Sequence, residues 1–193
     1  SKQASSSIRR GIERGKYLRK INNQTQNSYP QLNAFNRKTS AFQISMPEIN
    51  PYFMTRALEL GKRAFKKTGD NPWVGCVIVK NNKILGEGHT QPGGIPHAEA
   101  EAIRIAESKG HSLSGSTLYC TVEPCSFHGR SPSCANTIIE KKISHVVTAI
   151  RDPHPKVNGE GIRILKEAGI TVTEGIEGDA ARLFLADWLK GFE

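Results

Sequence analysis

Two short runs of the sequence carry residues that could do chemistry together. His97-Ala98-Glu99 comes first, and a loop with two cysteines follows at residues 124–134. One imidazole, two thiols and one carboxylate are the parts of a hydrolytic zinc site. A structural zinc site is closed by four protein ligands, whereas a catalytic one keeps three and leaves the fourth position to water. We therefore predict that His97, Cys125 and Cys134 bind zinc and that Glu99 moves protons.

These residue types suit the replacement of an exocyclic amine by oxygen. Zinc binds imidazole nitrogen and thiolate sulfur well, and it lowers the pKa of bound water from about 15.7 towards about 7. A carboxylate can accept a proton from the water and then protonate the ring nitrogen and the leaving ammonia. Glu99 suits this role if one helix turn presents it and His97 to the same cleft. Pro132 and Ser133 favour a helix start at Cys134, where the helix dipole favours a thiolate.

The order of these residues matches a known signature. Zinc deaminases share H-x-E followed by P-C-x-x-C, and this chain departs only in having eight residues, not two, between Cys125 and Cys134. His-Ala-Glu alone is a weak signal because many chains contain it by chance. Its combination with Pro-Cys and a second cysteine is specific, so we prefer it to the alternative of a buried histidine with two inert cysteines.

Apolar periodicity predicts the elements that must position the site. An apolar face at helical spacing predicts a first helix that ends near residues 68–72; its members are Phe53, Met54, Ala57, Leu58, Gly61, Ala64 and Phe65. Further helices are predicted at residues 98–108, 134–141, 161–168 and 179–189, and strands at residues 74–80, 84–88, 118–122, 145–150 and 171–173. This alternation predicts an α/β fold with a five-stranded mixed sheet, covered on both faces and largely parallel after the first hairpin.

Residues 1–50 differ in composition from the rest. They hold nine Lys or Arg against two acidic residues, whereas residues 51–193 hold eighteen against sixteen, so most of the net charge of +9 lies in this segment. We predict an extended basic N-terminal tail that precedes a single domain of residues 51–193. The tail suits organelle targeting, or docking on RNA or a large complex. The plainer interpretation is a solvated extension.

The cysteines indicate a reducing compartment. Cys76 and Cys120 lie in apolar runs and are predicted to be small buried strand residues, which argues against the two disulfides of a secreted protein. No apolar run approaches the roughly 18 residues that cross a membrane. We therefore expect a cytoplasmic location or a mitochondrial or plastid matrix, with no membrane partner.

The long cysteine loop resembles that of one family in particular. Its pattern, E-P-C-S-x-H-G-R-S-P-x-C at residues 123–134, resembles the deaminase domain of the bifunctional riboflavin-biosynthesis deaminase/reductase. The patterns N-P-x-V-G-C at residues 71–76 and D-P-H-P at residues 152–155 agree, so the resemblance covers about residues 51–190. It implies a three-layer α/β/α cytidine-deaminase-like fold. It also implies hydrolysis of the 2-amino group of a small phosphorylated pyrimidine, 2,5-diamino-6-(5-phosphoribosylamino)pyrimidin-4-one, with release of ammonia.

Carried over by position, the resemblance supports the same zinc ligands and adds substrate contacts. Asn71 would hydrogen-bond the pyrimidine. Arg130, where the family carries Lys or Arg, would face the substrate phosphate, because a guanidinium suits a phosphate dianion; the alternative is a solvated loop charge. Ser126 and His128 are loop-shaping candidates.

Three positions depart from the family. Phe127 and Thr90 stand where it often has histidine, although His89 is adjacent, and His154 replaces a common asparagine. None of the three is a predicted metal ligand. We expect them to line the sugar-phosphate side of the cleft, with His154 as a substrate contact. The family's reductase domain would begin about where this chain ends.

Other hypotheses stay open on the sequence alone. A tRNA or single-stranded DNA base deaminase is favoured by the tail, but the near-neutral catalytic part lacks an aromatic-basic stripe for stacking bases. A deaminase fold recruited as a structural component of an RNA-rich assembly would dock through residues 1–50. Self-association as a homo-oligomer is a further hypothesis. An apolar C-terminal face would either form that interface or pack on the sheet; it comprises Leu183, Phe184, Leu185, Trp188 and Leu189.

Overall fold

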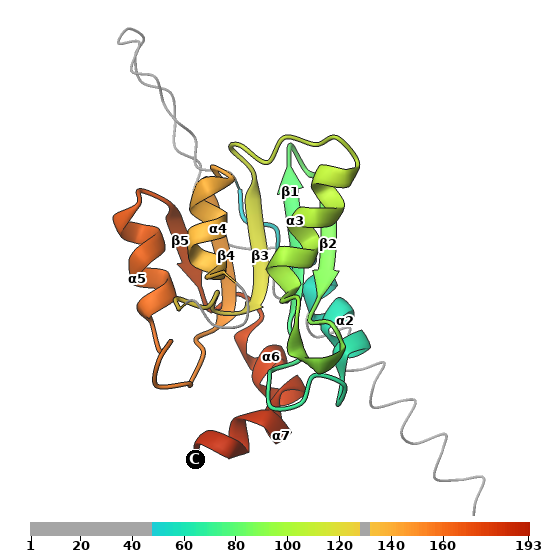
Figure 1. Cartoon of the computed structure of the whole chain (residues 1–193), viewed down its shortest axis with the longest axis vertical. Helices are drawn as coiled ribbons and strands as arrows, with labels where there is room; N and C mark the ends of the chain where they lie inside the picture. The colour runs from blue at the N-terminus through green and yellow to red at the C-terminus, as the bar shows by residue number, and fades with distance from the viewer. Residues whose placement is uncertain (1–47, 128–131) are drawn as a thin grey trace, which may run out of the picture. The chain divides into compact units, whose positions relative to one another are not determined.

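A computed structural model describes residues 48–127 and 132–193 (Figure 1). The predicted basic tail therefore lies outside the described residues except for its last three positions, and so do His128 and Arg130. The elements in chain order are α2 (Pro51–Gly61), η1 (Lys62–Ala64), β1 (Gly75–Lys80), β2 (Lys83–His89), η2 (Pro92–Gly94), α3 (Ala98–Ser108), β3 (Thr117–Val122), α4 (Cys134–Glu140), β4 (His145–Ile150), α5 (Glu160–Glu167), β5 (Thr171–Glu174), α6 (Gly178–Phe184), α7 (Ala186–Leu189) and η3 (Lys190–Phe192).

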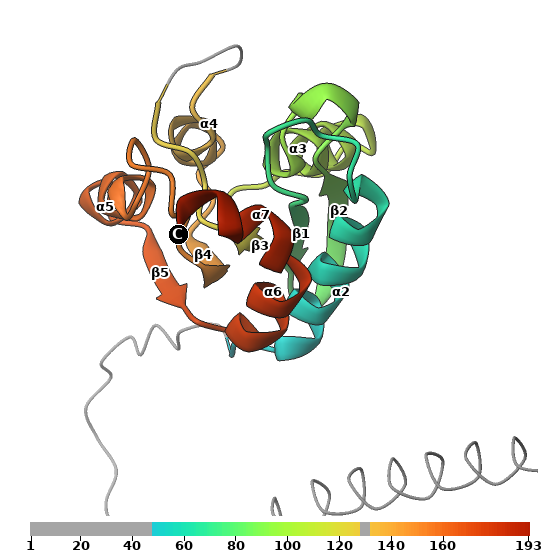
Figure 2. The same cartoon turned by 90° about the horizontal axis from the view of Figure 1, so that it is seen from below.

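Within the described residues, the strands form one mixed sheet in the order β2-β1-β3-β4-β5. β1 is antiparallel to both β2 and β3, and β4 and β5 then add in parallel. The hairpin turns through Asn81 and Asn82, which both have positive φ, as a tight two-residue turn requires. Figure 2 shows α2 and α6 on one face of the sheet and α3, α4 and α5 on the other. The predicted three-layer α/β/α fold with a five-stranded mixed sheet is confirmed.

The first helix is shorter than predicted. It begins at Pro51 after Asn50, whose side chain accepts a hydrogen bond from the backbone N–H of Tyr52, and it ends at Gly61 before a 3₁₀ turn. This change of pitch carries Phe65 off the buried face, so its predicted place there is wrong. Phe65 is 43% exposed and packs edge-on against Trp73, with ring centroids 4.5 Å apart. The rest of the predicted face is buried, namely Phe53, Met54, Ala57, Leu58, Gly61 and Ala64.

Two glycines let α3 lie directly on the hairpin. A Cβ at Gly86 would stand 2.2 Å from the carbonyl oxygen of Ala102, and one at Gly88 would stand 2.3 Å from that of Ala98. Helix backbone therefore occupies the space that side chains on β2 would need. Because His97 immediately precedes α3, this contact also fixes where the first predicted zinc ligand lies.

The C-terminal segment also differs from the prediction. In place of one helix over residues 179–189, α6 and α7 are separated by Leu185, whose backbone leaves helical geometry (φ −94°, ψ 9°). Leu185 is fully buried, whereas Leu183 is 81% exposed, so the predicted apolar face is divided. The break also turns Trp188 towards the segment after η1, where its indole N–H donates to the Asp70 carbonyl at 3.1 Å.

In the part of the chain that the structure describes, no helix has both the length and the apolar character needed to span a membrane.

The glycine contact generates a stability prediction. Gly88→Ala should lower the free energy of unfolding by about 1–3 kcal/mol, because the new methyl group meets the backbone of α3. Urea unfolding followed by circular dichroism measures this change. Gly191→Ala is the matched control, since a Cβ there meets nothing within 4 Å, and its effect should stay within about 0.5 kcal/mol. Equal losses in the two variants would contradict the packing argument.

Candidate active site

Three segments bring the predicted zinc ligands together. His97 is the extended residue that precedes α3, Cys125 lies in the loop after β3, and Cys134 is the first residue of α4. Ser133 caps α4, and its hydroxyl accepts a hydrogen bond from the backbone N–H of Asn136. The predicted helix start at Cys134 is confirmed.

The spacing of the three ligand atoms fits a tetrahedral metal. His97 Nδ1 lies 3.6 Å from Cys125 Sγ and 3.4 Å from Cys134 Sγ, and all three atoms lie within 4.8 Å of one another. Zn–S bonds of about 2.3 Å and Zn–N bonds of about 2.0–2.1 Å give a tetrahedron with N···S edges of roughly 3.5 Å. Two sulfurs and one nitrogen also suit zinc chemically and leave a fourth position for a non-protein ligand.

Hydrogen bonding makes the two thiols unequal. The Cys134 thiol and its backbone N–H, 3.3 Å from Cys125 Sγ, both donate to that sulfur. These donors, together with His97, hold the pKa of Cys125 well below its ordinary value. The pKa of Cys134 is raised, first by the same bond to Cys125 and then by burial. The lowered pKa favours the thiolate form of Cys125, which is the form that binds metal.

Glu99 lies in the first turn of α3 beside the ligand cluster. It is 4% exposed, and burial raises the pKa of its carboxyl to about 7. A group with a pKa near 7 can both accept and donate a proton at neutral pH, as general acid–base chemistry requires. The predicted juxtaposition of Glu99 with His97 is present in the structure.

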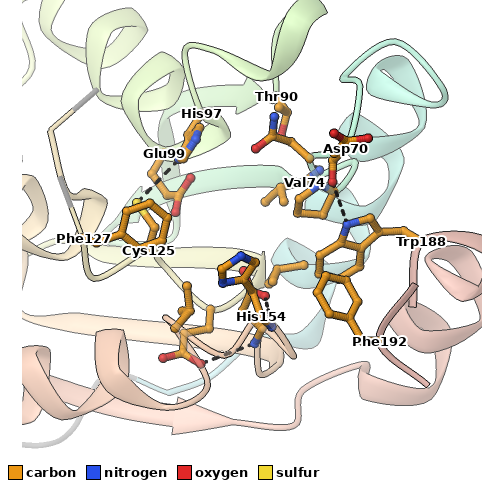
Figure 3. A pocket seen from close by; sticks show the side chains of 16 residues that line it. Asp70, Val74, Thr90, His97, Glu99, Cys125, Phe127, His154, Trp188 and Phe192 are labelled. Atoms are coloured by element: carbon orange, nitrogen blue, oxygen red, sulfur yellow. Dashed lines mark hydrogen bonds between the residues drawn. The ribbon is translucent and has the colours of Figure 1, made fainter. Parts of the chain in front are cut away.

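The cluster opens into a cavity of about 220 Å³ (Figure 3). Its lining comes from segments far apart in the sequence, including the last residues of the domain. The described lining residues are Asp70, Asn71, Pro72, Val74, Thr90, His97, Glu99, Val122, Glu123, Cys125, Phe127, Asp152, His154, Val157, Trp188 and Phe192.

Two predicted cleft residues are held on the hairpin side of this cavity. Asn71 donates its side-chain N–H to the Thr68 carbonyl at 3.3 Å, which fixes the direction of its carboxamide. Thr90 is buried, and its hydroxyl oxygen accepts the backbone N–H of Val74 at 3.2 Å. The neighbouring His89 is not among the described residues that line the cavity. It therefore does not replace the family histidine there.

The other predicted positions form the opposite wall. Phe127 is 41% exposed, and its ring centroid lies 6.2 Å from that of His154. Phe192 lies on the other side of His154, again with centroids 6.2 Å apart. Figure 3 shows Phe127 on one side of His154 and Phe192 on the other, at the cavity. Arg130, the predicted phosphate contact, lies outside the described residues.

Sequence reasoning missed part of the lining. Trp188 was predicted to lie at an interface or against the sheet, and Phe192 was not singled out. Both line the cavity. Glu123 and Asp152 also line it, although the sequence offered them only as parts of a family pattern. The one signal for Glu123 and Asp152 was their place in the motifs at residues 123–134 and 152–155. For Trp188 and Phe192 there was none.

The remaining cysteines are separate from the cluster. Cys76 and Cys120 face each other across β1 and β3, and both are fully buried free thiols. Burial raises the pKa of both, so they stay neutral. Their prediction as small buried strand residues is confirmed.

Comparison with known proteins places this arrangement in a class. Residues 47–150 match the family described as the cytidine and deoxycytidylate deaminase zinc-binding region. This match covers more than half of the chain. The chain belongs to this family of zinc-dependent deaminases, and zinc is the metal that the cluster fits.

Particular relatives narrow the class. The riboflavin biosynthesis protein RibD of Escherichia coli is 45% identical over 139 residues, which are 72% of this chain but 37% of RibD. A diaminohydroxyphosphoribosylamino-pyrimidine deaminase of Buchnera aphidicola is 44% identical over 139 residues, or 92% of that shorter protein. The solved structure of RibD from Acinetobacter baumannii (form 1) superposes with a TM-score of 0.69 at 44% identity, covering 74% of this chain and 39% of the other. This chain thus spans little more than a third of the RibD proteins that it matches.

The geometry of the cluster predicts which side chains are needed to bind zinc. Cys134→Ser should weaken zinc binding by more than about 100-fold, since losing a ligand costs more than losing one of its outer partners. Elemental analysis after gel filtration measures the zinc content, which in the unchanged protein should be roughly one ion per chain. Cys76→Ala, which alters a buried thiol outside the cluster, should keep its zinc. Retention of zinc by Cys134→Ser would exclude the proposed ligand set.

Proposed function

We propose that this chain hydrolyses the 2-amino group of 2,5-diamino-6-(5-phosphoribosylamino)pyrimidin-4-one and releases ammonia. The observation that carries the proposal is the cluster of His97, Cys125 and Cys134 beside the buried Glu99, at a small cavity that His97, Cys125 and Glu99 line. The substrate class is supported by the Buchnera deaminase, because the similarity extends over nearly all of that protein. A cavity of about 220 Å³ admits a single pyrimidine ring with its amino groups.

Each residue of the candidate site has a separate role in the proposed deamination. His97, Cys125 and Cys134 would hold zinc, which when bound supplies a Lewis acid that makes water nucleophilic near neutral pH. Glu99 accepts the proton of the attacking water. It delivers this proton to the ring nitrogen, then takes the proton of the hydroxyl now bonded to the ring carbon and passes it to the amino group, which leaves as ammonia when its C–N bond breaks. Asn71, with its carboxamide direction fixed, hydrogen-bonds the ring and sets which amino group faces Glu99.

The role of Glu99 can be tested directly. Glu99→Gln should lower kcat by roughly 10²–10⁴-fold, since the amide cannot carry protons, while zinc content stays unchanged. Ammonia release from the diaminopyrimidinone phosphate gives kcat. Glu101→Gln on the same helix, which breaks a surface pair with Arg104, serves as the control and should behave like the unchanged protein. A Glu99→Gln variant with full activity would refute the proton-carrier role.

Failure of the zinc-loaded unchanged chain to release ammonia would overturn the proposed substrate, provided that a bacterial RibD is active in the same assay. Turnover of a tRNA or single-stranded DNA oligonucleotide in place of the pyrimidine would instead favour the nucleic-acid alternative. The recruitment hypothesis concerns residues 1–50, almost all of which lie outside the described residues, so it stays a prediction.

We assign substrate phosphate recognition to Arg130, on its sequence position alone. Arg130→Ala should raise KM for the phosphorylated substrate roughly tenfold or more, because a charge-assisted hydrogen bond contributes about 1.5–3 kcal/mol. The KM for the dephosphorylated compound should not change. Arg163→Ala, which removes an exposed guanidinium paired with Glu160 on α5, is the matched control. An equal rise in KM for both compounds would count against a phosphate contact.

A further inference from the structure

The buried carboxyl group of Glu123, at the end of β3, accepts hydrogen bonds from three backbone N–H groups. Glu123 lies one residue after β3, is 3% exposed, and stands two positions before Cys125. Its Oε2 accepts the backbone N–H of Asp152 at 3.4 Å and of Gly159 at 2.9 Å, and its Oε1 accepts that of Ile162 at 3.1 Å. Both oxygens are therefore engaged by one segment, residues 152–162.

That segment forms part of the cavity wall. Its His154 and Val157 line the cavity, and Figure 3 shows His154 at the cavity between Phe127 and Phe192. The segment is also ordered internally. The backbone N–H of His154 donates to Asp152 Oδ1 at 2.8 Å, and that of Lys156 donates to His154 Nδ1 at 3.2 Å. Because the imidazole is fixed to its own loop, the position of the loop decides where the imidazole lies.

Other contacts join the same segment to the residues around Cys125. The Ser126 hydroxyl donates to the Lys156 carbonyl at 3.0 Å. A Cβ at Gly161 would stand 2.0 Å from the Pro124 carbonyl oxygen, so the start of α5 lies directly on the cysteine loop. The position of residues 152–162 relative to the candidate zinc ligands is thus set by Glu123, Pro124 and Ser126.

We propose that Glu123 is a positioning residue. It sets the distance between the cavity wall formed by residues 152–162 and the three candidate zinc ligands, and it thereby sets substrate affinity. No reacting atom needs to touch it. The kinetic part of this inference rests on the proposed pyrimidine deamination. Its structural part, the anchoring of residues 152–162, does not.

Glu123→Gln tests the proposal with an isosteric side chain. The amide replaces one acceptor oxygen by a donor that would face a backbone N–H, so the anchoring weakens while the volume stays the same. The expected result is a KM for the diaminopyrimidinone phosphate raised about tenfold, with kcat changed much less and zinc content unchanged. Amide hydrogen exchange should become faster within residues 152–162.

Glu140→Gln is the matched control, because Glu140 is exposed at the end of α4; all its values should equal those of the unchanged protein. An unaltered KM with unaltered exchange in Glu123→Gln would overturn the proposal. Loss of zinc together with kcat would also overturn it, since Glu123 would then support the metal ligands. If Glu123→Gln does not fold, Gly161→Ala leaves the carboxyl group intact, moves α5 off Pro124 and should raise KM in the same selective way.

If the unchanged protein does not turn over the diaminopyrimidinone phosphate, the proposed function fails by itself. Hydrogen exchange and zinc content of Glu123→Gln still decide the anchoring role in that case.

Discussion

The close approach of α3 to the β1–β2 hairpin is the constraint on which the site depends. Because Gly86 and Gly88 have no side chains, the backbone of α3 lies directly on β2. This contact fixes the distance between the start of α3 and the sheet. His97 and Glu99 then occupy one turn at the edge of the cavity. The two cysteines come from the other side, through the loop after β3 and the capped start of α4. Backbone packing on one side and a helix cap on the other thus place the Glu99 carboxyl beside the candidate zinc ligands.

The sequence predicted those parts of the fold whose signals are local. The helix at residues 98–108 and the strand at residues 145–150 were predicted with the bounds that the structure shows, because an apolar face at helical spacing marks the first and a short, mostly apolar run marks the second. Phe65 and the single C-terminal helix were wrong. In both places a change of backbone pitch moves a side chain, and no residue type marks it. The grouping of His97, Cys125 and Cys134 was predictable because the chemistry of zinc ligands restricts the residue types.

Glu123 shows why other residues of the site could not be predicted from the sequence. Its partners are backbone N–H groups, which almost every residue supplies, so the sequence of residues 152–162 carries no sign of the bond. Trp188 is similar, since its partner is the Asp70 carbonyl. None of the departures from the family replaces a candidate zinc ligand or Glu99. Thr90 uses its hydroxyl within the fold, and Phe127 and His154 extend a row of aromatic side chains that Phe192 completes.

The bond between Trp188 and Asp70 also ties the C-terminal segment to a part of the chain that precedes all the candidate zinc ligands. The three candidate zinc ligands end at Cys134, whereas two side chains of the cavity lining, Trp188 and Phe192, follow much later in the chain. Because a domain generally folds as a unit, the ligand cluster and these two side chains reach their places together. A chain cut short before Trp188 would keep every candidate zinc ligand and still lack part of the cavity wall.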